Sequence, residues 1–200
     1  MMNKRLKQGS TFLLALALTF PLLALPGARA ANAVETDKTD CSLEFSVGGN
    51  NDELKTTEIK VDLYKVASID ESGNYTAIGA FKKLDLSSVS ADDLDAAAAT
   101  WAERAKEAQG KLTDSEGNTV VDPTETVTLQ NGRGSQDKLK TGLYLVDTPE
   151  VVTTNYTYTF TPYLVSLPTN NYYSNGNDTW IYDLTDTNAI GLKPEEHARY

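Results

Sequence analysis

The sequence predicts a mainly β protein, an antiparallel sandwich with one helical insertion. Short segments with alternating apolar and polar residues recur along the chain, and turn-forming residues separate them at close intervals. A single segment carries apolar residues at helical spacing instead. Many short strands with one helix favour two packed antiparallel sheets.

Composition limits the function classes. The chain has 200 residues, with 18 Lys+Arg against 28 Asp+Glu and a formal charge of -10. This acidic balance argues against a nucleic-acid partner. A lone Cys and a lone His argue against a disulfide scaffold, a metal centre and a catalytic triad. We therefore expect one domain that has no cofactor and is not an enzyme.

Residues 1–30 have the three regions of a secretory signal peptide. Lys4, Arg5 and Lys7 form a positive start, residues 11–25 are uncharged and mostly apolar, and residues 28–30 read Ala-Arg-Ala, a cleavage pattern. The apolar run is shorter than the ~20 residues of a membrane span. We predict a secreted protein. Cleavage there removes four basic residues and no acid, so the charge changes from -10 to -14.

The rest of the chain is predicted to be strands after a polar, loose tail over residues 31–41. Cys41 is expected to be a small core residue. The apolar alternation changes phase at Tyr64, which predicts a bulge or strand end there. The predicted strand segments are 42–47, 56–69, 75–81, 112–121 (a hairpin), 125–129, 139–147, 156–167 and 179–185.

The predicted helix covers about 91–109. Ser90 and Asp93 resemble a capping box, and Gly110 stands where a C-terminal cap belongs. Trp101 is interpreted as the core anchor of this helix rather than a ligand-stacking residue. The apolar residues at helical spacing are Leu94, Ala97, Ala98, Trp101, Ala105 and Ala108.

Five segments form an ordered series along the chain. They are Ile59-Lys60-Val61-Asp62-Leu63-Tyr64-Lys65-Val66-Ala67, Lys140-Thr141-Gly142-Leu143-Tyr144-Leu145-Val146, residues 156–168, Trp180-Ile181-Tyr182-Asp183-Leu184-Thr185 and Leu192-Lys193-Pro194-Glu195-Glu196. This series resembles the N-terminal domain of the sortase-assembled pilins of Gram-positive bacteria. The resemblance covers roughly residues 42–200.

The resemblance implies an immunoglobulin-like β-sandwich over residues 42–190, followed by a linker, 191–200, to a further domain. We expect the chain to be an N-terminal piece of a longer pilin, because it contains no sorting signal. Leu167-Pro168-Thr169-Asn170 has Asn where such a signal has Gly, and we interpret it as a turn. The implied function is that of a structural subunit in a covalent, cell-wall-attached pilus that serves adhesion. The implied partners are other pilin subunits and a pilus-specific sortase.

Lys193 is the candidate acceptor for the sortase. In the family, a sortase cleaves a sorting signal and joins the new carboxyl to a lysine amine of the next subunit. The usual acceptor motif ends in Tyr-Pro-Lys, whereas this chain has Thr187-Asn188-Ala189 at that place. Lys193 is the nearest lysine. Its alternative interpretation is an ordinary solvated linker residue. The chemistry needs an exposed, flexible amine that is deprotonated when it attacks.

The resemblance also suggests an internal amide bond, which forms between a buried lysine and a carboxyl or amide group beside a second acid. The candidate lysines are Lys60 and Lys65, with Asp183 as the partner and Asp147 as the assisting acid. Burial would favour the neutral, reactive forms of both partners. Solvated charges on strand faces are the alternative interpretation.

Two other functions stay open at this stage. In a glycan- or host-protein-binding adhesin, Tyr172, Tyr173 and Trp180 would form an exposed aromatic surface beside a polar loop. In a secreted hydrolase, two of the 28 acids would act as a pair, although no pattern selects that pair and His197 lies in the tail.

Overall fold

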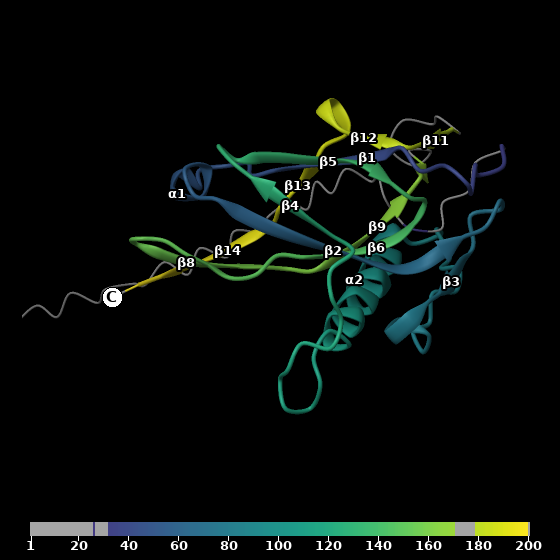
Figure 1. Cartoon of the computed structure of the whole chain (residues 1–200), viewed down its shortest axis with the longest axis horizontal. Helices are drawn as coiled ribbons and strands as arrows, with labels where there is room; N and C mark the ends of the chain where they lie inside the picture. Colours follow the sequence, from purple (N-terminus) through teal and green to yellow (C-terminus); the bar gives the residue numbers. More distant parts are fainter. Residues whose placement is uncertain (1–25, 27–31, 171–178, 200) are drawn as a thin grey trace, which may run out of the picture.

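The computed structural model describes residues 26, 32–170 and 179–199. The fold is mainly β and built of curled, mostly antiparallel sheets, as the sequence predicts (Figure 1). The first sheet contains β5 (Arg133–Leu139), β1 (Cys41–Ser46), β12 (Asp183–Leu184) and β13 (Ile190–Gly191). The second sheet contains β3 (Tyr75–Ala77), β4 (Glu125–Leu129), β2 (Ile59–Ile69), β6 (Gly142–Asp147) and β9 (Tyr163–Leu167).

Two smaller sheets complete the β structure. One has the order β14 (Pro194–Ala198), β8 (Tyr156–Phe160), β7 (Val151–Val152). The other pairs β10 (Thr169–Asn170) with β11 (Trp180–Ile181). The segment 156–167, predicted as one strand, is therefore split at Thr161-Pro162 into β8 and β9, which belong to different sheets.

Two strand pairs are parallel, which the antiparallel prediction did not include. β1 pairs parallel with both β12 and β13. These strands come from opposite ends of the chain, so no short hairpin dictates their relative direction.

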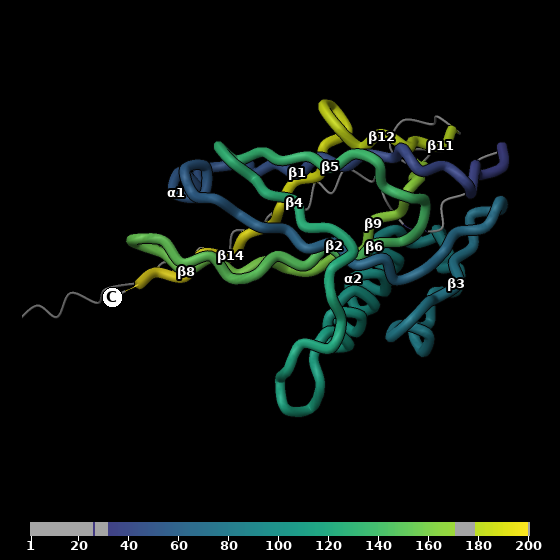
Figure 2. The backbone as a smooth tube through the Cα atoms, in the orientation of Figure 1, coloured from purple at the N-terminus to yellow at the C-terminus, as the bar shows by residue number. Residues whose placement is uncertain are grey.

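The second sheet is buried on both faces, so the body has three layers. One face packs on the first sheet in a core that includes Leu43, Phe45, Val61 and Leu63. The other face packs on helix α2 (Leu94–Gly110) in a second core with Leu145. Figure 2 shows α2 and the loop that follows it projecting from the sheets.

The change of phase in β2 results from this double burial. Leu63 belongs to the core between the sheets, whereas Tyr64 and Val66 belong to the core under α2. The strand continues through Tyr64, and its irregularity falls between Lys65 and Ala67, slightly later than predicted.

Helix α2 begins three residues later than its predicted start at 91. The side chain of Asp93, not Ser90, forms the N-cap and accepts a hydrogen bond from the backbone N–H of Ala96. Gly110 is the last helical residue, and Lys111 is the C-cap. Trp101 is buried as predicted and packs edge-on against Tyr75 at 6.0 Å.

The prediction of one helix misses the short helix α1 (Asp52–Lys55). Its four residues are too few to create a periodic pattern. Two 3-10 turns, η2 (Gly79–Phe81) and η3 (Asp186–Asn188), were also not predicted. η2 replaces the end of the strand expected over 75–81.

The segment 32–40, expected to be loose, is held against the body. Val34 is 3% exposed, and its N–H donates to the carbonyl of Glu71. The backbone N–H of Glu35 donates to the hydroxyl of Tyr182 at 2.9 Å. Cys41 belongs to β1 and to the core, as predicted for its side chain.

The predicted signal peptide lies outside the described residues, apart from Pro26. Within the part of the chain that the structure describes, no helix combines the length and apolar character that crossing a membrane requires.

Candidate functional site

Lys193 lies at the point where the chain passes from one sheet to another. Before it, β13 pairs with β1, and the N–H of Leu192 donates to the carbonyl of Ser46 at 2.8 Å. After it, Pro194 begins β14, which pairs with β8. The backbone is therefore fixed on both sides. Within the segment 191–200, expected to form a linker, residues 194–198 form strand β14 of the body.

Lys193 is half-buried and its Nζ atom is buried, so the amine is not the exposed, flexible group that was expected. Burial lowers the pKa of its amine from 10.5 to about 8, because desolvation disfavours the charged form. The neutral fraction at pH 7 rises by roughly two orders of magnitude as a result. The site thus holds, at a fixed position, an amine that loses its proton more readily than an ordinary lysine amine.

We expect the Lys193 amine to titrate near pH 8. The measurement is NMR of protein labelled with 13C-lysine, following the Cε shifts with pH, and the signal missing from Lys193→Arg identifies the residue. A midpoint for that signal near the ordinary lysine value would contradict the burial argument.

The lowered pKa of Lys193 also makes stability depend on pH. Between the folded and unfolded pKa values the unfolded chain binds more protons, so the contribution of Lys193 to the free energy of unfolding increases as pH rises from about 8 to 10.5.

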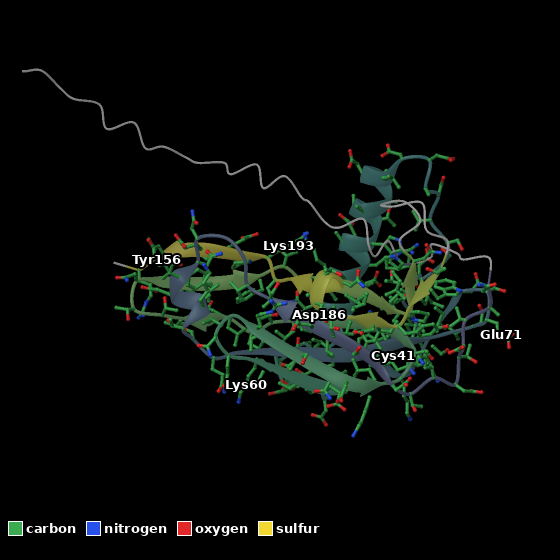
Figure 3. The ribbon with its side chains drawn as sticks, turned by 90° about the horizontal axis from the view of Figure 1, so that it is seen from above. Cys41, Lys60, Glu71, Tyr156, Asp186 and Lys193 are labelled. Atoms are coloured by element: carbon green, nitrogen blue, oxygen red, sulfur yellow. The ribbon has the colours of Figure 1, made fainter. Side chains whose placement is uncertain are left out.

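The four residues suggested for an internal amide bond are not brought together. Lys60 is exposed on the helix side of β2, opposite Thr128 of β4. Lys65 is half-buried on the other face of β2, and burial, reinforced by the charge of Lys140, lowers its pKa. In the view of Figure 3, Lys60 and Lys193 lie on opposite sides of the body.

The two acids of that set face away from Lys65. Asp147, at the end of β6, points to the helix side, where it accepts a hydrogen bond from Nε2 of Gln109 at 2.8 Å. Asp183 lies in β12 of the first sheet. Its neighbour Leu184 faces the core, so Asp183 faces outward.

Two hydroxyl donors hold the Asp183 carboxylate. Ser42 and Thr185 each donate to it at 2.6 Å, and these bonds lower its pKa. An ionised, exposed carboxylate is a poor partner for amide formation.

The suggested aromatic surface is described only at Trp180. Its ring is half-buried, and Nε1 donates to the carbonyl of Asn32 at 2.6 Å. Trp180 thus ties the N-terminal segment to β11. Tyr172 and Tyr173 lie outside the described residues.

Comparison with known proteins gives limited information. No family model matches the chain, and no curated protein matches it. Among solved structures, the chain is similar to the full-length major pilin SpaD from Corynebacterium diphtheriae, with 15% sequence identity and a TM-score of 0.45 over 80% of this chain. The chain spans 31% of that pilin's length.

Proposed function

We propose that the protein is a secreted structural subunit of a covalent surface pilus of a Gram-positive bacterium, and that Lys193 is the amine through which it is linked. In this role the chain contributes no catalysis of its own. A pilus-specific sortase forms the bond, and the neighbouring subunit supplies the acyl group.

The Lys193 amine is the observation that carries the proposal. To attack an acyl-enzyme, an amine must be neutral, and burial brings the pKa of this amine to about 8. The nitrogen would form an amide with the acyl carbon, lose its proton and displace the enzyme. The pairings of β13 and β14 hold the residue at one place on the body.

The three-layer body supports a mechanical role. Two apolar cores are built on the faces of one sheet, so bending that sheet would disturb both. Strands β8 and β14 extend toward one tip, beside which the C-terminal end is marked (Figure 1). Lys193 precedes β14 and lies about halfway along the body, whereas Tyr156 lies at the tip (Figure 3), so the proposed linkage joins the side of a stiff unit.

The test is an immunoblot of cell wall released by muramidase from the organism that makes the protein, after boiling in detergent. A ladder of high molecular mass is the expected result, since amide bonds survive this treatment. A single band at the monomer position contradicts the proposal.

A further inference from the structure

A cleft of about 520 Å³ opens on the helix side of the second sheet. It lies between the C-terminal end of α2, the hairpin that follows the helix, the middle of β2 and the end of β6. The hairpin is closed by a bridge between Thr113 and Thr119. The lining residues that matter here are Asp62, Tyr64, Lys106, Gln109, Leu112 and Asp147.

Two carboxylates stand side by side at one end of the cleft. Asp62 of β2 and Asp147 of β6 are direct partners in the strand register. Thr126 donates to Oδ1 of Asp62 at 2.7 Å, and Gln109 donates to Oδ1 of Asp147 at 2.8 Å. Both donors are neutral, so they orient the carboxylates without cancelling their charge. Neither acid forms an ion pair with any residue in the described ranges.

Tyr64 adds a hydroxyl without a described protein partner to the same cleft. Its side chain is 6% exposed and lines the cleft beside the two acids, and its hydroxyl makes no hydrogen bond within the described part of the chain. Burial and the carboxylates of Asp62, Asp147 and Asp122 raise its pKa to about 12, so it stays protonated. The ring is buried, but the hydroxyl is not among the buried atoms that lack a partner, so it is open to the cleft and can accept a hydrogen bond from a bound cationic group.

The charges and walls of the cleft define the ligand. Two carboxylates line the cleft, those of Asp62 and Asp147, and a third, that of Asp122, is close enough to act on Tyr64. The one basic lining residue is Lys106, which forms no ion pair with a described residue. Leu112 and the Tyr64 ring belong to the apolar core under α2 and give the cleft an apolar wall. A metal ion is less suitable, because no three acidic, His or Cys groups among the described residues are placed so that they could hold one together.

We propose that this cleft binds an alkylammonium or alkylguanidinium group, the chemistry of a lysine or arginine side chain. The aliphatic stem packs on Leu112 and the Tyr64 ring. The cationic head donates to the carboxylates of Asp62 and Asp147 and to the Tyr64 hydroxyl. The binding does not depend on polymerisation, so the cleft and the pilus assignment stand or fall separately.

The test uses n-butylamine as the probe and 1-butanol as its uncharged match, at low salt. Purified protein expressed from the full chain is followed by 1H–15N NMR. We expect saturable shifts that are centred on residues 62–64, 106–112 and 145–147 with the amine and absent with the alcohol. Linear, unsaturable shifts spread over the acidic surface would overturn the proposal.

Three variants locate the binding. Asp147→Asn keeps an acceptor for Gln109 and should weaken butylamine binding roughly five- to tenfold, and Tyr64→Phe should weaken it by a smaller factor. Asp137→Asn removes the same charge from an exposed position on β5 and should leave the affinity unchanged. Equal weakening by Asp147→Asn and Asp137→Asn would mean diffuse attraction and would overturn the proposal.

A second probe identifies the source of the cation. The peptide acetyl-Gly-Lys-Gly-amide carries the same ammonium on a polypeptide. If it binds at least as tightly as butylamine, the natural ligand is a protein side chain. If butylamine binds and the peptide does not, the cleft takes a small free amine. Failure of both probes contradicts the proposal.

Discussion

Replacement of Lys193 by arginine is expected to abolish the covalent ladder on the cell wall. Arginine keeps the positive charge and nearly the same length, but its guanidinium stays protonated and is not a nucleophile at any pH that the cell meets. The lysine amine, by contrast, is partly neutral near pH 8. The substitution therefore removes the chemistry, and because the site disfavours a charged group, thermal unfolding of the variant checks that it still folds.

The chain offers a matched control for this variant. Lys65 is the second half-buried lysine whose pKa burial lowers, and it lies in the middle of β2 rather than at the chain crossover. Lys65→Arg should leave the ladder intact, as read on the same immunoblot. If the ladder persists in Lys193→Arg and disappears in Lys65→Arg, the linkage is formed by Lys65, and our assignment to Lys193 is wrong.

Replacing Gly134 by alanine should destabilise the fold by about 3 kcal/mol. Gly134 lies in β5, close to the backbone of β4. An added Cβ would stand 2.4 Å from the carbonyl oxygen of Thr128 and 2.9 Å from its carbonyl carbon. Backbone atoms of a paired strand cannot move aside as a flexible side chain can, so the two sheets must separate locally.

A glycine in the same sheet provides the control. Gly191 in β13 has open space where its Cβ would be, and its φ requires no glycine. Gly191→Ala should be neutral or should stabilise the fold by up to ~1 kcal/mol. Thermal unfolding followed by circular dichroism measures both variants, with a loss of roughly 10 °C expected for Gly134→Ala. Equal melting temperatures for the two variants would show that β5 and β4 are not as close as described.

The sequence predicts elements where local pattern and burial agree. The alternation in β2 and the apolar run of β6 were identified as strands, and α2 was identified from its apolar spacing. The phase change at Tyr64 predicts an irregularity, and β2 has one between Lys65 and Ala67. The same residues also form a second buried face, against α2, which the alternation alone does not predict.

Elements that depend on distant partners were missed. β5 has one buried residue, Leu139, so its strand conformation follows from pairing with β1 and not from an apolar pattern. β14 has none, and its pairing with β8 converts an expected linker into a strand. Sequence gives the face of each residue within a strand but not the sheet to which that strand belongs, which is why Asp183 was grouped with Lys60 and Lys65.

The position of Lys193 could be predicted, but its environment could not. The motif resemblance selected the residue from its place in the chain. Its partial burial depends on β13 and β14 being held by two different sheets, which no local pattern records. The lowered pKa is a consequence of that tertiary arrangement.

Mass spectrometry of the wall-released polymer tests the central claim most directly. We predict a branched peptide in which Nζ of Lys193 carries, through an amide bond, the carboxyl end of a second subunit. Lys193 recovered unmodified throughout the polymer, or a branch on another lysine, would contradict the account.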